Sequence, residues 1–143
     1  MCAKPKVQLS IPDTGSLSIG DNCFFHSGVK LILTMPKPIV EIGQWVFVGL
    51  DTIIAAKQSI EIGDFTFFAP RCYVIDHEHG FEPGQLIHNQ KSILKSVKIG
   101  RDCYVGTGSV VLGGANIGDG AIIGACSVVK GEVGSGEIWA GNP

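Results

Sequence analysis

The sequence predicts an all-β protein whose chain winds into a three-sided column of short parallel strands. One observation is that the dipeptide Ile-Gly begins at residues 19, 42, 62, 99 and 117. The other is that each of these Ile residues opens a run of three apolar positions spaced six apart, filled in every case by an aliphatic residue or Phe. The positions are Ile19, Phe25, Leu31, Ile42, Val48, Ile54, Ile62, Phe68, Val74, Ile99, Val105, Val111, Ile117, Ile123 and Val129.

A period of six fits neither the 3.6-residue period of a helix nor the alternation of a long half-buried strand. It fits a short strand followed by a turn, and three such units close one triangular coil of about 18 residues. Each apolar residue then points into the column, where the coils above and below cover it. We therefore expect a single domain over residues 1–143, built from about five coils.

Two further positions of the repeat support this fold. Small side chains usually follow each aliphatic residue by four positions, as expected where two inward residues share a narrow face. Gly, Asn or Asp often follows by three, and these residue types tolerate the left-handed backbone of a tight corner. The corner residues of this kind are Asn22, Gly28, Asp51, Asp102, Gly108, Gly114 and Gly120. Trp45, Phe65, Arg71 and Cys126 depart from the pattern, so we expect those corners to be built differently.

Extra residues interrupt the repeat at three places, 37–41, 60–61 and 80–98. The third is the longest, and it predicts a loop extruded from the column over about residues 76–98. Functional residues commonly lie on loops that a rigid scaffold positions, so this loop is the first place to search for a site.

The fifth position after the first aliphatic residue of each coil should point outward. It holds a large apolar side chain in all five coils: Phe24, Phe47, Phe67, Tyr104 and Ile122. A continuous apolar stripe on one face indicates a protein interface. Columns joined through such faces can close into a ring, and we expect a homotrimer.

Composition excludes several classes of protein. Hydrophobic residues make up 45% and charged residues 17%, which argues against disorder, and the scattered basic residues with a net charge of -2 argue against nucleic-acid binding. No signal peptide or long apolar run stands near Met1, so we expect a cytoplasmic protein without a membrane partner. The five cysteines form no CxxC pair, which indicates reduced thiols. Three of them, Cys23, Cys72 and Cys103, occupy the small inward position, where Cys acts as a small hydrophobe rather than a nucleophile.

The segments IGDFTFFAPRCYVIDHEHGF, VKIGRDCYVGTGSVVLGGANIGDGAIIGACSVV and AGNP resemble the hexapeptide-repeat acyltransferases, in particular the galactoside, maltose and polysaccharide O-acetyltransferases. The resemblance implies a left-handed winding of the β-helix and a homotrimer. It also implies acetyl-CoA as co-substrate, no metal, and a small acceptor, such as a sugar or glycan precursor, that is acetylated on a hydroxyl group.

Within that resemblance, the histidine that enters the long loop corresponds to the catalytic base, which here is His77. A hydroxyl attacks a thioester only when a base removes its proton, and histidine suits this task because its ordinary pKa lies near neutrality. Asp76 either fixes the tautomer of His77 or only caps a turn. His79 either orients the substrate, exchanges roles with His77, or is solvated.

The resemblance also assigns residues to the donor. It places the main-chain N–H that stabilises the tetrahedral intermediate in residues 104–107, with Thr107 preferred. Coenzyme A is expected to lie along the last coils, where Gly106, Thr107, Gly124 and Ala125 let the main chain approach it and Lys130 meets a phosphate.

Other functions remain open. The acceptor group is either a hydroxyl or an amine, as in amino-sugar and xenobiotic acetyltransferases. A non-catalytic hexapeptide scaffold is a second class of function. A zinc carbonic anhydrase on the same column needs three converging histidines, whereas His77 and His79 have no third histidine on the following coil.

Overall fold

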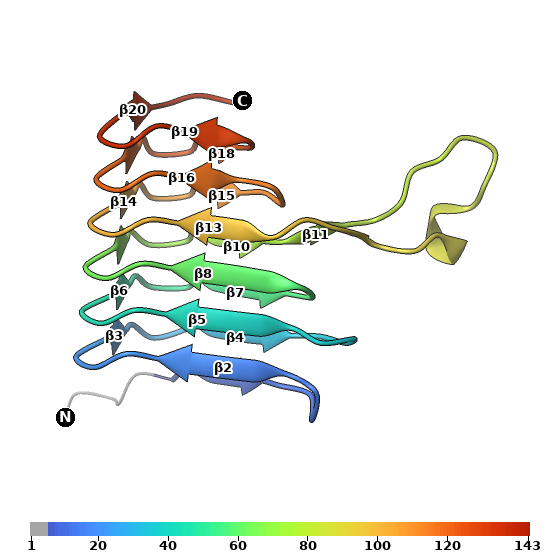
Figure 1. Cartoon of the computed structure of the whole chain (residues 1–143), viewed down its shortest axis with the longest axis horizontal. Helices are drawn as coiled ribbons and strands as arrows, with labels where there is room; N and C mark the ends of the chain where they lie inside the picture. Colours follow the sequence, from blue (N-terminus) through green and yellow to red (C-terminus); the bar gives the residue numbers. More distant parts are fainter. Residues whose placement is uncertain (1–5) are drawn as a thin grey trace.

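The structure, a computed structural model, describes residues 6–143 and contains three parallel β-sheets that form the sides of a column (Figure 1). Successive strands pass from one sheet to the next, and each strand pairs in parallel with the strand one coil later. Val105, for example, lies between Phe68 of the preceding coil and Ile123 of the following one. The fold is the predicted left-handed parallel β-helix.

Each sheet holds six strands. Sheet A contains β1 (Gln8–Ser10), β4 (Lys30–Leu33), β7 (Ile53–Ala56), β10 (Tyr73–Ile75), β15 (Val110–Val111) and β18 (Val128–Val129). Sheet B contains β2 (Ser16–Ile19), β5 (Ile39–Ile42), β8 (Ser59–Ile62), β13 (Val97–Ile99), β16 (Asn116–Ile117) and β19 (Glu132–Val133). Sheet C contains β3 (Phe24–Phe25), β6 (Phe47–Val48), β9 (Phe67–Phe68), β14 (Tyr104–Val105), β17 (Ile122–Ile123) and β20 (Ile138–Trp139). The corners between them are named B–C, C–A and A–B in chain order.

The column has about six turns rather than the predicted five. Five complete coils run from β2 to β18, as the repeat indicates. Strand β1 precedes them, and β19 and β20 follow them, so that partial turns at the two ends add a sixth strand to every sheet. The sequence count missed them because the last turn opens with Val133-Gly134 rather than with Ile-Gly.

The core consists of the aliphatic residues that the repeat predicts to point inward. Val105 and Ile123 are fully buried, and burying a side chain of this size contributes about 1.5–3 kcal/mol to stability. Two predicted core residues differ, because Ile19 is 42% exposed and Phe25 is only partly buried. Both belong to the first complete coil, and within residues 6–143 no strand lies beneath β2 or β3 to cover them.

The small inward positions are filled as predicted, apart from Cys23, which is only partly buried. Where the small residue is polar, its hydroxyl donates to a corner carbonyl. Thr66 Oγ1 donates to Gly100 O at 2.8 Å, and Ser109 Oγ donates to Gly124 O at 2.9 Å. These bonds satisfy groups whose burial without a partner is unfavourable.

All seven corner residues predicted to be left-handed have positive φ, between 53° for Asp102 and 87° for Gly114. The expectation that the four departing corners are built differently is wrong, because Trp45, Phe65, Arg71 and Cys126 have φ of 57–61°. Their main-chain N–H groups are held by the coil below, as in the bond from Phe65 N to Gln44 O at 2.9 Å. Stacking therefore imposes the same left-handed corner on every residue type. The conformational cost is roughly 1–2 kcal/mol for each corner residue that is not Gly, Asn or Asp.

The three outer faces differ in polarity. On sheet C, the predicted stripe is a ladder of neighbouring side chains whose aromatic rings stack at centroid distances of 5.2, 4.4 and 5.7 Å. The ladder comprises Phe24, Phe47, Phe67, Tyr104, Ile122 and Ile138. Sheet A presents the neighbours Gln8, Lys30, Ile53, Tyr73, Val110 and Val128, of which the first two are polar. Sheet B presents Ser18, Glu41, Glu61, Lys98, Asn116 and Glu132. Sheet C is thus apolar, sheet A is apolar from Ile53 onward, and sheet B is polar.

All three interruptions lengthen a connection from sheet A to sheet B, although residues 39–41 belong to β5 and residues 60–61 to β8. The longest forms an arm that extends away from the column (Figure 1). Its base is an antiparallel pair, β11 (His77–Glu78) with β12 (Ile93–Leu94), and it carries a short 3₁₀-helix, η1 (Ile87–Asn89). Within residues 6–143, this is the one helical element, and no helix of a length and hydropathy suited to crossing a membrane occurs there.

Candidate active site

The arm is fastened to the column at its base. Lys57 Nζ donates to Ser92 Oγ at 2.9 Å, which ties the returning strand of the arm to the coil below. Lys130 Nζ lies 3.7 Å from Glu78 Oε1, which ties the outgoing strand to the A–B corner two coils above β10. A side chain on β11 is therefore held in a defined position beside the A–B corner.

Asp76 is the buried anchor of this base. Its side chain is 0% exposed, and its two oxygens accept main-chain N–H groups from Lys57 at 2.8 Å and Gln58 at 2.7 Å. His77 Nδ1 lies 2.9 Å from Asp76 Oδ1. Asp76 therefore caps the turn at residues 57–58 and also contacts the His77 ring.

This contact determines how the His77 ring can act. An ionised carboxylate has no proton to donate, so in a hydrogen bond between Asp76 Oδ1 and His77 Nδ1 the ring nitrogen is the donor. Nε2 is then the ring atom with a free lone pair, and the His77 side chain is 18% exposed. A carboxylate that fixes one ring nitrogen and leaves the other free is the arrangement of a general base.

The other histidines lack such a partner within the part of the chain described. His79 follows β11 and is exposed, and no side-chain hydrogen bond holds it there. His88 is exposed on η1 at the far part of the arm. His26 is exposed at the C–A corner of the first coil, where its Nδ1 accepts the N–H of Ser27 at 2.8 Å. The geometry singles out His77.

The residues expected to contact coenzyme A occupy a different corner. Gly106, Thr107, Gly124 and Ala125 lie at the C–A corner of consecutive coils. The N–H groups of Gly106 and Gly124 donate to Ile123 O and to Trp139 O, both at 2.8 Å, so they are engaged within the column. Among residues 6–143, the N–H groups of Thr107 and Ala125 have no acceptor, and both residues are exposed. These two amides are available to a ligand.

One chain does not bring the two corners together. Gly113 lies against Asp76, because a Cβ on Gly113 would stand 3.2 Å from the Asp76 carbonyl carbon. Thr107 precedes Gly113 by six residues across the width of sheet A, which spans roughly 15–20 Å. Lys130 also lies at the A–B corner, beside Glu78 rather than beside Gly124 and Ala125. Asp76, His77 and Lys130 thus form one group, and the four donor-site residues form another.

The buried cysteines are poor nucleophiles. Burial raises the pKa of the Cys72 thiol from 9.0 to about 11, and burial also raises the pKa of Cys103. A thiol that holds its proton at neutral pH does not attack a thioester. Cys23, Cys72, Cys103 and Cys126 are free thiols, and Cys2 lies outside the described residues. Over residues 6–143, no three His, Cys, Asp or Glu side chains converge as a metal site.

Sequence reasoning missed two parts of the site. The N–H groups of Lys57 and Gln58, which hold Asp76, belong to the main chain, and only the interruption of the repeat near residues 60–61 hinted at a special turn. The pairing of Lys130 with Glu78 depends on the direction in which the arm leaves the column, which the repeat does not encode.

Comparison with known proteins assigns the chain to one family. Residues 86–131 match the family described as bacterial transferase hexapeptide (six repeats). The protein is 31% identical to WbbJ of Escherichia coli, named as a putative lipopolysaccharide biosynthesis O-acetyl transferase, over 93% of this chain and 71% of that one. The chain belongs to the hexapeptide transferases.

Two further relatives bear on this hexapeptide transferase. A probable acetyltransferase of Mycobacterium tuberculosis is 33% identical over 92% of the chain, which spans 44% of that protein's length. The structure of AntD, an N-acyltransferase from Bacillus cereus in complex with dTDP-4-amino-4,6-dideoxyglucose and coenzyme A, superimposes with a TM-score of 0.82. That match covers 96% of this chain and 74% of AntD at 23% identity, which shows the shared fold.

Proposed function

We propose that this hexapeptide transferase moves an acetyl group from acetyl-CoA to a hydroxyl of a small acceptor, a sugar or glycan precursor, with His77 as general base. The observation that carries the proposal is the Asp76–His77 pair at the base of the arm, because it leaves His77 Nε2 free to accept a proton. The names of the relatives support acetyl transfer, and WbbJ supports a hydroxyl acceptor.

The reaction follows from the position of the ring. His77 Nε2 takes the proton of the acceptor hydroxyl while that oxygen attacks the thioester carbonyl. A main-chain N–H, for which we propose Thr107, donates to the oxyanion of the tetrahedral intermediate. As the intermediate collapses, the carbon–sulfur bond breaks and the proton on His77 passes to the departing thiolate. Asp76 stabilises the imidazolium between the two transfers.

We propose that the site forms between two copies of the chain in a homotrimer. His77 and Thr107 lie at opposite edges of sheet A, too far apart in one chain to act on the same thioester. Sheet C and the part of sheet A from Ile53 onward are apolar, so each copy can offer one face to each of two neighbours, as a closed ring requires. The A–B corner of one copy and the C–A corner of the next then supply the two halves.

Fewer residues are proposed to contact coenzyme A than the sequence implied. We propose Thr107 and Ala125 as the residues whose free N–H groups face coenzyme A, with Gly106 and Gly124 allowing close approach of the chains. Lys130 can reach a phosphate only by leaving Glu78, since that pair holds it beside the arm.

We place the reaction in the cytoplasm, consistent with free thiols at four described cysteines.

A second candidate is transfer to an amine. AntD is an N-acyltransferase and was solved with an amino-sugar nucleotide, which favours this alternative for the same fold. An amine acceptor also loses a proton during attack, so His77 would keep its role. Acceptor pairs that differ only in a hydroxyl or an amino group at one sugar carbon distinguish the two reactions.

The test compares His77→Ala with wild type in an assay of thiol release from acetyl-CoA, with galactosides, maltose and nucleotide sugars as acceptors. We expect kcat to fall about 10²–10⁴-fold, the usual contribution of a positioned base. His88→Ala is the matched control, since it removes an exposed imidazole from the same arm and should change kcat by less than about twofold.

Two outcomes contradict the proposal. Unchanged turnover in His77→Ala removes the general-base role. Binding of acetyl-CoA by the wild type without turnover on any acceptor supports the alternative of a non-catalytic scaffold.

A further inference from the structure

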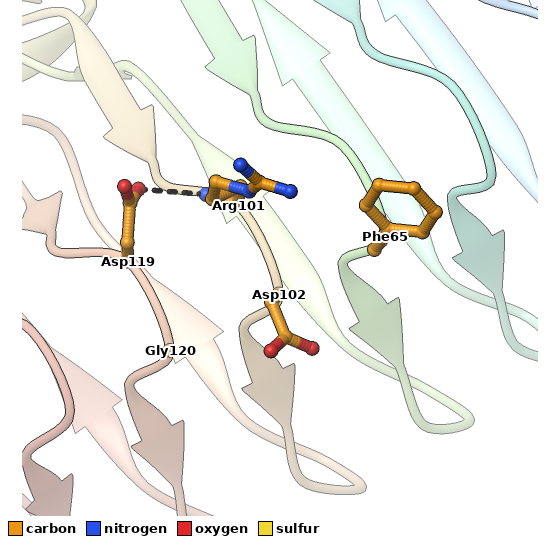
Figure 2. A pocket seen from close by; sticks show the side chains of 5 residues that line it. All are labelled: Phe65, Arg101, Asp102, Asp119 and Gly120. Atoms are coloured by element: carbon orange, nitrogen blue, oxygen red, sulfur yellow. Dashed lines mark hydrogen bonds between the residues drawn. The ribbon is translucent and has the colours of Figure 1, made fainter.

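The B–C corner carries a hollow that neither half of the proposed active site uses. It is an open depression of about 470 Å³ lined by Phe65, Arg101, Asp102, Asp119 and Gly120 (Figure 2). His77 lies at the A–B corner and Thr107 at the C–A corner, so the hollow occupies the third corner of the column. It borders sheet B, which is the polar face.

Two aromatic residues at this corner are held at an energetic cost without being buried. Trp45 and Phe65 lie on consecutive coils, with φ of 57° and 61°, and their side chains are 55% and 44% exposed. Asn22 occupies the equivalent position one coil earlier with φ of 59°, which shows that the corner accepts a residue suited to this conformation. Left-handed aromatic residues that gain little from packing indicate a role outside the fold.

The polar groups around Phe65 are available for binding. The Arg101 guanidinium carbon lies over the Phe65 ring at 5.8 Å from its centre, a cation–π contact, and Figure 2 shows the guanidinium extending toward the ring. The main-chain N–H of Arg101 donates to Asp119 Oδ1 at 2.9 Å. Among residues 6–143, the Arg101 guanidinium has no acidic partner and the Asp102 carboxylate accepts no hydrogen bond.

The mixture of charges narrows the class of ligand. Two carboxylates repel an anion such as a phosphate, and the guanidinium repels a cation. A pyranose is neutral, has an apolar C–H face that fits an aromatic ring, and has a rim of hydroxyls that both donate and accept. The apolar face of the sugar can pack on the Phe65 ring. Arg101 can donate hydrogen bonds to the sugar's hydroxyl oxygens, and Asp102 can accept hydrogen bonds from its hydroxyl groups.

We propose that the B–C corner binds a saccharide chain, with one sugar ring lying on Phe65 and a neighbouring sugar near Trp45. Coils are spaced about 4.7–4.9 Å apart, so the two aromatic residues line up along the column and suit a chain better than a single sugar. The site takes no part in acyl transfer and stands without the proposed reaction. It would hold a glycan at the outside of the column.

The test is a calorimetric titration of cellohexaose and of maltohexaose into the protein without acetyl-CoA. Phe65→Asn should weaken binding of the bound hexasaccharide about tenfold or more, and Arg101→Ala should weaken it as well. Phe65→Asn should also raise Tm by a few degrees, because Asn relieves the left-handed strain. A Tm that does not fall shows that weaker binding by Phe65→Asn is not caused by unfolding.

Arg71→Asn is the matched control. Arg71 is an exposed residue at the C–A corner with φ of 61°, so its replacement should raise Tm in the same way without changing saccharide binding. Three results overturn the proposal: no binding of either hexasaccharide by the wild type at millimolar concentration, unchanged binding by Phe65→Asn, or loss of self-association in Phe65→Asn, which would make a second copy the occupant. Acetyl transfer to a monosaccharide is assayed separately and tests only His77.

Discussion

Asp76 shows how one buried carboxylate can serve both the fold and the chemistry. It accepts two main-chain N–H groups from the coil below and contacts the His77 ring, and its side chain has no exposed surface. Charged acceptors of this kind form stronger hydrogen bonds than neutral ones. A substitution that weakens the hydrogen bonds of Asp76 should therefore lower both the free energy of unfolding and kcat.

Asp76→Asn tests this coupling. The amide keeps the shape but places an NH₂ group against an N–H donor, so we expect the free energy of unfolding to fall by about 2–3 kcal/mol in urea titrations. Because the amide can also donate to Nδ1 and favour the wrong tautomer, kcat of the folded enzyme should fall about 10²–10⁴-fold. Asp64→Asn is the control, since Asp64 Oδ1 accepts one N–H, from Gln44, at an exposed corner. An equal fall in kcat in Asp76→Asn and Asp64→Asn would show that the contact between Asp76 and His77 is unimportant for turnover.

Cys72 gives the protein a pH dependence at the alkaline end. Its folded-state pKa is raised by burial to about 11, so the unfolded chain loses the thiol proton first, near pH 9. The contribution of Cys72 to stability is therefore complete below pH 9 and is lost as the pH rises toward 11. The loss is about 1.4 kcal/mol for each unit of pKa shift.

Urea denaturation at pH 8, 9, 10 and 11 measures this loss. Cys72→Ala should be less stable than wild type at pH 8 but should show a smaller decline between pH 9 and 11. Ala fits the position, because Ala115 and Ala121 fill the same small inward slot on other faces. Parallel declines in the two proteins would show that other groups cause the alkaline loss.

At the scale of the element, each strand depends on the coils on either side of it. Val105 in β14 is fully buried between β9 and β17, whereas Ile19 in β2 has a strand on one side only within residues 6–143 and is 42% exposed. Equivalent residues of the repeat should therefore contribute unequally to the free energy of unfolding, less at the end of the column than in its middle.

Replacing each of these residues by Ala measures that difference. Val105→Ala should lower the free energy of unfolding by about 2–4 kcal/mol, since a cavity remains in a closed core. Ile19→Ala should cost less than about 1 kcal/mol although it removes a larger side chain. A larger loss in Ile19→Ala would mean that the first coil is covered in solution by residues outside the described part.

The elements that sequence could predict are those that the repeat itself determines. Inward residues such as Ile123, corner glycines such as Gly108 and the apolar ladder on sheet C follow from a period of six. The conformation of Phe65 was mispredicted because stacking, rather than residue type, imposes a left-handed corner. His77 was identified from its place at the start of the long loop, but its contact with Asp76 and the turn that holds Asp76 depend on main-chain groups of another coil.

At the scale of the whole molecule, the proposed reaction needs His77 and Thr107 from different copies, because the two residues lie at opposite edges of sheet A. Thr107→Pro removes the proposed oxyanion donor with little change to the corner, because Pro70 occupies the equivalent position one coil below. We expect kcat to fall about 10²–10³-fold in this variant while the molar mass measured by light scattering stays at that of a trimer.

Mixing the two damaged proteins distinguishes a shared site from a site within one chain. Trimers assembled from His77→Ala and Thr107→Pro subunits contain some interfaces in which an intact His77 faces an intact Thr107. If each site combines two copies, the mixture regains a measurable fraction of wild-type turnover after denaturation and joint refolding, although neither variant is active alone. If both residues acted within one chain, every site in the mixture would carry one of the two lesions, and refolding them together would restore nothing.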